Sequence, residues 1–154
     1  MIHIYTDGSC ISNPNGAGGW AIAIIEEDGC EYYFSDKNSC TTNNRMELLA
    51  AIKGLEALKL TKSEVTIVSD SKYVVDAINQ KWIYGWLKKN WKDVKNSDLW
   101  VQFWKLYQQH VVTMKWIKGH NAHVENERCD VLATQAADEG PHAIDAAFEA
   151  LNKS

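Results

Sequence analysis

The order in which strand-like and helix-like segments follow one another constrains the fold of this chain more than any other feature. Three strand-like segments come first, at residues 1–9, 19–26 and 30–35, and the turn pair Asp28-Gly29 separates the second from the third. Helical spacing of apolar residues then begins, and strand-like and helical segments follow one another along the rest of the chain. This order predicts an α/β fold, in which helices cover the faces of a sheet of antiparallel and parallel strands.

The same patterns predict the remaining elements. They are helices at 44–58, 71–79, 96–109 and 124–137, and strands at 64–69 and 111–118. Gly140-Pro141 ends the last of these helices, and residues 144–151 are expected to form a short amphipathic tail helix. At 154 residues the chain has the length of one domain, with a body at 1–140 and a tail at 141–154.

Four acidic residues stand where a charge is costly. Asp7 and Asp70 are expected at the ends of apolar strands, and two more acids, Glu47 and Asp130, lie on or beside apolar helix faces. Two carboxylates about 4 Å apart repel by roughly 4 kcal/mol at an effective dielectric constant of about 20. Four of them converge only if most are protonated or if cations lie among them. Two divalent ions would balance four carboxylates, as in a two-metal phosphoryl-transfer site.

Each of these acids also has a simpler interpretation. Asp7-Gly8 is a favoured turn pair, and Glu47 stands at capping-box spacing from the expected start of its helix. Asp70 could cap the helix that follows it, and Asp130 could lie on an exposed helix surface. The residues alone leave these alternatives open.

Charge is distributed unevenly along the chain. Residues 81–95, the basic segment, contain five lysines and one acid, a net +4, which leaves −8 on the rest of a chain whose total is −4. The aromatic residues interleaved with these lysines are Trp82, Tyr84, Trp86 and Trp91. An acidic body with one basic, aromatic segment indicates a local contact with a polyanion. The alternative is ordinary amphipathic packing, with the tryptophans inside and the lysines in solvent.

Residue spacing argues against several other kinds of site. His120, His123 and Cys129 match no zinc-finger spacing and have no fourth ligand. The glycines at 16–19 are not followed by Gly-Lys-Ser/Thr, so a P-loop is rejected. Four cysteines without paired spacing favour a reducing, cytoplasmic compartment. The longest apolar run, residues 20–25, is too short to span a bilayer, and no signal-peptide core is expected.

Five short motifs follow one another between residue 1 and about residue 138. They are Thr-Asp-Gly-Ser at 6–9, Thr-Thr-Asn-Asn-Arg-Met-Glu at 41–47, Ser-Asp-Ser-Lys-Tyr-Val at 69–74, Trp-Ile-Lys-Gly-His at 116–120 and Glu-Asn-Glu-Arg-Cys-Asp at 125–130. Together they resemble bacterial type 1 ribonuclease H. The resemblance implies the fold of that family, a mixed five-stranded sheet flanked by helices. It also implies an endonuclease that hydrolyses the RNA strand of RNA–DNA hybrids and leaves 3′-hydroxyl and 5′-phosphate ends.

The resemblance implies roles for individual residues. The family's catalytic, metal-ligating carboxylates are matched by Asp7, Glu47, Asp70 and Asp130. Two Mg²⁺ ions per active site are implied when substrate is bound, and Mn²⁺ can substitute for them. His120 matches the family's loop histidine, which helps to move a proton or to release product, although a lone loop histidine is usually only solvated. The substrate-binding positions implied are Asn13, Thr42, Asn43, Asn44, Lys72, Trp82, Trp86, Lys88, Lys89 and Asn96.

The expected body, residues 1–140, is then a ribonuclease H catalytic domain, and the basic segment resembles the protrusion that holds the DNA strand. A monomer that contacts the hybrid duplex and no membrane is expected. The chain departs from the family pattern in three places. Lys72 stands where the family commonly has glutamine, the loop at 92–98 is short, and the tail at 141–154 has no counterpart.

Three other functions compete with this one. A hybrid-binding module without catalysis would lack a carboxylate, and none is missing. Resolvase- or transposase-like nucleases of the same fold lack both the Asn43-Asn44 pair and a tryptophan-rich basic segment. A small partner-binding domain would bind no divalent ions.

Overall fold

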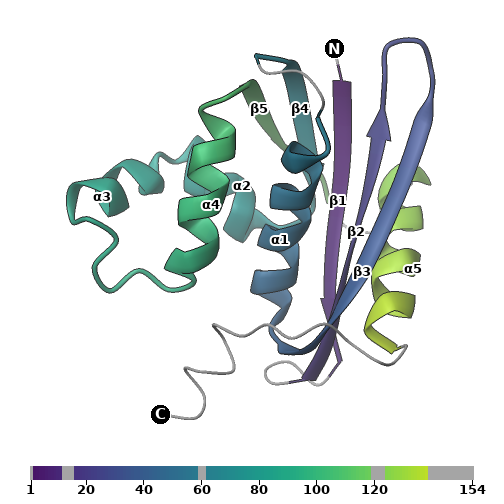
Figure 1. Cartoon of the computed structure of the whole chain (residues 1–154), viewed down its shortest axis with the longest axis horizontal. Coiled ribbons are helices and arrows are strands. Elements are labelled where there is room, and N and C mark those ends of the chain that lie inside the picture. The colour runs from purple at the N-terminus through teal and green to yellow at the C-terminus, as the bar shows by residue number, and fades with distance from the viewer. Residues whose placement is uncertain (1, 12–15, 59–61, 119–123, 139–154) are drawn as a thin grey trace.

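The computed structural model describes residues 2–11, 16–58, 62–118 and 124–138, and it is a sheet with helices on both faces (Figure 1). The strands are β1 Ile2–Cys10, β2 Gly16–Ile25, β3 Glu31–Thr41, β4 Glu64–Ser69 and β5 Val111–Trp116. The helices are α1 Asn43–Glu56, α2 Lys72–Asn79, α3 Trp82–Lys88, α4 Ser97–Tyr107 and α5 Val124–Asp138. Among the described residues, no helix is both long and apolar enough to cross a membrane.

The sheet has five strands in the order β3-β2-β1-β4-β5. The pairs β1–β2 and β2–β3 are antiparallel, whereas β1–β4 and β4–β5 are parallel. Gly29, at φ +86°, supplies the left-handed residue of the turn between β2 and β3. The expected mixed five-stranded sheet is therefore confirmed.

The second and third strands are longer than their apolar patterns predict. β2 begins at Gly16, three residues before its expected start, and β3 runs to Thr41 through a polar stretch that was not expected to be a strand. This stretch pairs with β2 through backbone groups, from Tyr33↔Ala23 to Thr41↔Gly16 with a register irregularity near Gly16. Alternation of apolar and polar residues reveals a strand only where one face of the strand is buried. A strand whose side chains are all polar is held by backbone hydrogen bonds and shows no such pattern.

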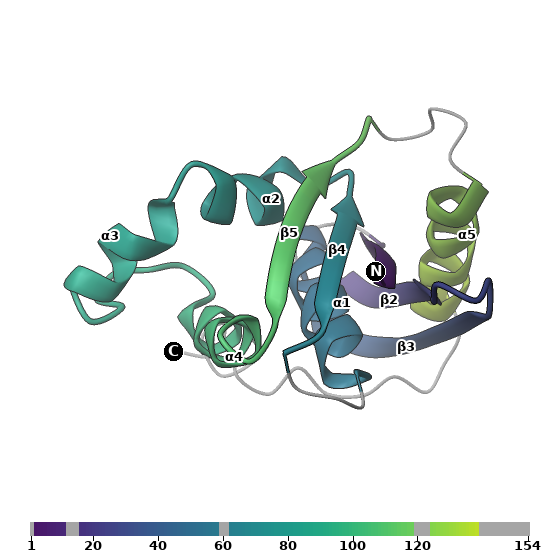
Figure 2. The same ribbon diagram turned by 90° about the horizontal axis from the view of Figure 1, so that it is seen from above.

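The two faces of the sheet are covered differently. Figures 1 and 2 show α1, α2 and α4 on one face and α5 on the other. The main core lies between the sheet and the helices α1, α2 and α4, where Ile4, Ile52 and Trp100 are fully buried. Under α5 the fully buried part of the contact is made of small side chains, Ala21, Ala23, Cys129 and Ala133, and larger side chains surround it only partly buried. Small residues let α5 lie close to the sheet.

The basic segment contains α3, which lies to one side of the body beyond α2 and α4 (Figure 2). Its five lysines are all exposed. Ile83 is fully buried, and Trp86 packs against Trp100 with ring centroids 5.1 Å apart. Trp82 and Tyr84 are about half exposed, at 47% and 48%. Amphipathic packing thus accounts for some of the aromatic residues of this segment, and Trp82 and Tyr84 remain at the surface.

Several predictions concern residues outside the described part of the chain. These are the loop residues Asn13 and His120, the tail at 141–154 and its expected helix at 144–151.

Candidate active site

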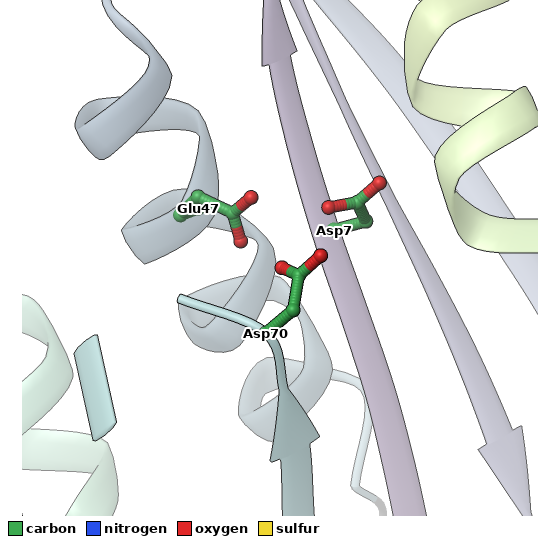
Figure 3. Close-up of side chains that lie close together, drawn as sticks. All are labelled: Asp7, Glu47 and Asp70. Carbon is green, nitrogen blue, oxygen red and sulfur yellow. The ribbon is translucent and has the colours of Figure 1, made fainter. Parts of the chain in front are cut away.

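Three of the four acidic residues meet at one point of the sheet (Figure 3). Asp7 comes from β1, Glu47 from α1, and Asp70 from the position directly after β4. One carboxylate oxygen from each lies within 4.8 Å of the other two. Asp7 is 3% exposed, whereas Glu47 and Asp70 are half-buried, so the cluster is open to solvent on one side.

A gap in the sheet makes the meeting possible. The parallel pairing of β1 with β4 ends at Tyr5↔Val68, whereas the pairing of β1 with β2 continues to Cys10. Beyond Tyr5, therefore, β1 has no paired strand on its β4 side. Asp7 shares its side of the strand with Tyr5, which packs under α5, while Glu47 reaches the gap from α1 on the other face. The cluster is built from both layers of the fold.

Gly8 brings β1 and α1 into backbone contact beside this gap. A Cβ on Gly8 would lie 2.3 Å from the backbone nitrogen of Glu47 and 2.4 Å from the carbonyl carbon of Met46. The Gly8 N–H donates a hydrogen bond to the Glu47 carboxylate. The φ of Gly8 is not in the left-handed region, so glycine is required here for space rather than for backbone conformation.

The capping interpretations of the acids are wrong. Thr42 caps α1, where its Oγ1 accepts from the Arg45 N–H at 3.2 Å, and Glu47 stands five residues after this cap. Ser71 caps α2 and accepts from the Val74 N–H at 3.4 Å, so the preceding aspartate is not the cap. Neither acid is therefore explained by helix capping.

The turn interpretation of Asp7-Gly8 is also wrong, because both residues lie within β1 and pair with Ala21 and Trp20.

Asp70 lies at the C-terminal edge of the parallel pair β4–β5, where α/β folds commonly place their functional sites. Trp116 holds the chain there, because its Nε1–H donates to the carbonyl oxygen of Asp70 at 3.0 Å.

The electrostatics of the cluster strongly favour a bound cation. Burial is the main cause that raises the pKa of Asp7 to about 8; contact with Glu47 lowers it, and Asp70 and Asp130 raise it further. Burial, followed by the charges of Asp7 and Asp70, also raises the pKa of Glu47 well above its usual range. Asp7 Oδ2 and Glu47 Oε2 are buried without a hydrogen-bond partner among the described residues. Buried carboxylate oxygens without donors are suited to a metal ion.

Asp130, the fourth acid, lies beside this cluster rather than within it. It is half-buried on α5, and its contact with Asp7 and its charge both raise the pKa of that residue. The preceding residue, Cys129, is fully buried, and its thiol donates to the Tyr5 carbonyl oxygen at 3.6 Å. The close approach of α5 to β1 thus places Asp130 next to Asp7, and the interpretation as an exposed surface acid is wrong.

A groove with a volume of about 530 Å³ surrounds the carboxylates. Its lining residues are Gly8, Ser9, Cys10, Asn43, Asn44, Glu47, Asp70, Ser71, Lys72 and Tyr73. Three of the expected substrate-binding residues, Asn43, Asn44 and Lys72, therefore lie on the same groove as the acids. The Lys72 ammonium group lies over the ring of Trp116, 4.8 Å from its centroid.

The other expected substrate-binding residues in the described part of the chain are not among those that line this groove. Lys88 and Lys89 are exposed at the end of α3, and Thr42 is the α1 cap described above. The side chain of Asn96 is bonded within the protein: its Oδ1 accepts from Arg45 at 3.2 Å and its Nδ2 donates to the Tyr73 hydroxyl at 3.0 Å. Any contact of the Asn96 side chain with substrate competes with these bonds.

Sequence reasoning missed three residues that shape the site, namely Arg45, Tyr73 and Trp116. Arg45 is a buried cation, and its spacing of three and seven residues from Leu48 and Ile52 was a signal that it lies on the buried side of α1. Its partner Asp98 lies more than fifty positions away in sequence, and no local pattern connects them.

Comparison with known proteins gives one consistent family. The family model described as RNase H matches residues 1–138. "Ribonuclease H" of Lachnoclostridium phytofermentans is 51% identical over 158 residues, which cover 96% of this chain and 99% of that protein. "Ribonuclease HI" of Shewanella oneidensis is 48% identical over 155 residues, which cover 97% of this chain and 96% of that protein.

Solved structures show the same likeness. LC9-RNase H1, described as a type 1 RNase H with the type 2 active-site motif, superposes with a TM-score of 0.80 at 27% identity, over 99% of this chain and 81% of that one. LC11-RNase H1 in complex with an RNA/DNA hybrid superposes with a TM-score of 0.70 at 26% identity, over 90% of this chain and 97% of that one.

Proposed function

Since this chain belongs to the ribonuclease H family, we propose that it hydrolyses the RNA strand of RNA–DNA hybrids by metal-assisted, in-line attack of water. The products are a 3′-hydroxyl and a 5′-phosphate end. The observation that carries the proposal is the convergence of Asp7, Glu47 and Asp70 from three separate elements, with Asp130 beside them. No carboxylate of the set is missing, which disfavours a binding module without catalysis.

The residues present fit divalent cations. Carboxylate oxygens are the ligands that Mg²⁺ and Mn²⁺ prefer, and the two unpartnered buried oxygens of Asp7 and Glu47 would gain a partner. We therefore assign Asp7, Glu47, Asp70 and Asp130 to two Mg²⁺ ions, with Mn²⁺ as a substitute. Bound divalent ions supply Lewis acidity, which lowers the pKa of water and neutralises charge on a leaving oxygen.

The chain's own residues hold the charges and the substrate. Asp7 and one carboxylate oxygen of Glu47 are kept from solvent, so their attraction for a cation is weakly screened. Asp70 lies at the edge of the groove, where a phosphodiester can approach. His120 is assigned to proton movement at the leaving group or to product release.

Selectivity for RNA needs a contact with the ribose 2′-hydroxyl, the group that DNA lacks. Glu47 is assigned to this contact, because it lies on the groove beside the exposed side chains of Asn43 and Asn44. Asn43, Asn44 and Asn13 would then contact the backbone and minor groove of the hybrid. Lys72 and Thr42 flank them at the starts of α2 and α1.

The basic segment is assigned to the DNA strand. Its exposed lysines, Lys88 and Lys89 among them, can meet phosphates, and the half-exposed Trp82 offers a flat apolar surface to a sugar. Trp86 packs against Trp100 of α4 and so holds the segment against the body of the protein, and Asn96, at the end of the segment, accepts a hydrogen bond from Arg45. These contacts position the hybrid and do not take part in bond cleavage.

The remaining assignments concern the whole chain. Residues 1–140 are proposed to act as one catalytic domain that includes the basic segment, as a monomer in a reducing cytoplasm. In the described part of the chain, Cys30 and Cys129 are free thiols, which is compatible with that compartment.

One experiment tests the function. End-labelled RNA–DNA hybrid, RNA duplex and DNA duplex are each incubated with the protein, with and without Mg²⁺. We expect cleavage of the hybrid alone, only with Mg²⁺, and only in its RNA strand; ligation and phosphatase treatment then identify the ends. Equal cleavage of the DNA duplex, or cleavage of the hybrid in EDTA, would overturn the proposal.

A further inference from the structure

Arg45 is a buried cation near the active site that the proposed reaction does not use. Its side chain is 1% exposed, and Nη1 and Nη2 donate to the two carboxylate oxygens of Asp98 at 3.0 and 2.7 Å. Nη1 also donates to Oδ1 of Asn96 at 3.2 Å. A buried ion pair often adds little to stability compared with apolar residues of the same size. We therefore consider which residues this pair holds in position.

The hydroxyl group of Tyr73 extends this arrangement. It accepts hydrogen bonds from Nδ2 of Asn96 at 3.0 Å and from Nε1 of Trp100 at 2.9 Å, so both of its lone pairs are used. The rings of Tyr73 and Trp100 also meet edge to face, with centroids 5.6 Å apart. Arg45, Asp98, Asn96, Tyr73 and Trp100 form one connected set, the anchor network.

The anchor network joins the active-site groove to the basic segment. Arg45 lies near the start of α1, the helix that supplies the second carboxylate, and Tyr73 lies at the start of α2 and lines the groove. Asn96 is the residue at which the chain leaves the basic segment and enters α4. Trp100 packs against Trp86 of α3, with centroids 5.1 Å apart. The network therefore contacts the basic segment at two places. One is α3, and the other is the return connection, residues 89–96, which leads from α3 to α4.

The return connection needs external support. Four non-glycine residues there have left-handed backbone conformations, at φ between 53° and 64°: Asn90, Trp91, Asp93 and Asn96. Asn and Asp adopt this conformation more readily than other non-glycine residues, whereas for Trp91 it costs roughly 1 kcal/mol, so the surrounding structure has to hold the connection. The side chain of Asn96 is held on both its oxygen and its nitrogen by the anchor network.

We propose that Tyr73 is a positioning residue for cleavage, whose hydroxyl group, with Asn96 and Arg45, holds the basic segment rigidly in one orientation relative to the carboxylates. The proposal rests on the proposed function. A correctly placed basic segment would hold the hybrid on its lysines while the RNA strand lies at the carboxylates. Tyr73 acts through Asn96 and Trp100 and not on the reacting phosphate.

The first test uses the free protein and needs no substrate. Tyr73→Phe removes only the hydroxyl oxygen, and Tyr107→Phe is the matched control, because Tyr107 is also half-buried and packs its ring against Phe103 and Trp104 in the last turn of α4. Heteronuclear NOE values of the amides of Lys88 and Lys89 report the order of the basic segment. We expect these values to fall in Tyr73→Phe only. Unchanged values would overturn the proposal.

The second test measures hybrid cleavage. Loss of one hydrogen-bonded hydroxyl should raise KM about fivefold and leave kcat within about twofold, and Tyr107→Phe should change neither. The KM effect should shrink when Lys88 and Lys89 are already alanine, because the oriented lysines are then absent. Two effects that simply multiply would show that Tyr73 acts independently of the segment and would overturn the proposal.

The two tests separate the proposal from the proposed function. If the lysine replacements alone leave KM unchanged, the assignment of the lysines to phosphates is wrong, and the NOE values decide on the anchor network. If Tyr73→Phe does not fold, Asn96→Gly takes its place, because glycine accepts the left-handed backbone of residue 96 and removes only the amide. The same fall in NOE values is expected, and its absence counts equally against the proposal.

Discussion

The backbone nitrogen of Glu47 lies so close to Gly8 that a Cβ atom on Gly8 would be only 2.3 Å from it. A strand residue and a helix residue that are far apart in sequence are thus in direct main-chain contact. Their contact sets the distance between Asp7, the neighbour of Gly8, and the Glu47 carboxylate.

Gly8→Ala should destabilise the protein by about 1–3 kcal/mol and reduce cleavage, because the new methyl group must push α1 away from β1. Urea denaturation and initial cleavage rates measure the two effects. Gly85→Ala is the matched control, since no atom lies within 4 Å of a Cβ at that exposed position of α3. It should be neutral or stabilise the protein by about 0.5–1 kcal/mol. Similar losses in both variants would contradict the explanation.

Asp7→Asn should stabilise the metal-free protein at neutral and alkaline pH. The pKa of Asp7 is raised from its ordinary 3.8 to about 8, so the folded state retains a proton that the unfolded state loses across this range. Stability of the metal-free wild type should therefore fall as pH rises from 3.8 to about 8, and the amide variant should show a flatter profile. Urea denaturation in EDTA at pH 5 and pH 9 tests this. A stability advantage for the variant that does not grow with pH would refute it.

Asp70→Asn should fold normally and bind hybrid but lose cleavage by more than about 10²-fold, the upper range for residues that only support a metal ligand. Cleavage rates with Mg²⁺ and hybrid binding in Ca²⁺ give the two measurements. Asp36→Asn, on the exposed part of β3, is the control and should cleave normally. Substantial turnover by Asp70→Asn with Mg²⁺ would remove Asp70 from the set of ligands.

His120→Ala should lose part of its turnover, less than any carboxylate variant. A side chain that assists proton transfer contributes typically 10²–10⁴-fold at most, and less where water can take its place. Single-turnover and steady-state rates distinguish an effect on chemistry from an effect on product release. A loss as deep as that of Asp70→Asn would make His120 an essential base or ligand.

Lys88→Ala combined with Lys89→Ala should raise KM and leave kcat nearly unchanged, because phosphate contacts position the duplex without touching the reacting bond. The slope of log affinity against log salt concentration should fall by about 0.9 for each lost contact, or roughly 1.8 for both. Lys105→Ala, exposed in the last turn of α4, is the control and should keep the wild-type slope. An unchanged slope in the double variant would leave these lysines as a solvated surface.

Most of the order of elements could be predicted because it depends on local patterns, although α3 was not expected, and the choice of the four acids as one site came from the resemblance to a known family. Apolar periodicity marks a strand or a helix, and an acid at the end of such a pattern is visible in one dimension. The capping interpretation of Glu47 failed because Thr42 and Asn44 are both acceptable N-caps, and only the path of the chain from β3 into α1 decides between them. Likewise, β3 reaches Thr41 through backbone pairing that polar side chains do not reveal.

Long-range pairs could not be predicted. The ion pair of Arg45 with Asp98 joins α1 to α4, and neither residue stands in a pattern that points to the other. The space that Gly8 leaves for α1 is also a property of two elements, and its sequence suggests a turn when considered alone. Residues whose role depends on a partner from another element are the ones that the sequence alone misses.

The gap beyond Tyr5, where the carboxylates meet from both layers of the sheet, has a consequence for a chain that is still being synthesised. Asp7 emerges within the first ten residues, whereas Asp130 is carried by α5, and the two become neighbours only when that helix docks on β1 and β2. A nascent chain that ends before α5 contains β1, α1 and β4 and still lacks the fourth carboxylate. If Asp130 is a metal ligand, as proposed, hybrid cleavage should therefore begin only after this long-range docking is complete.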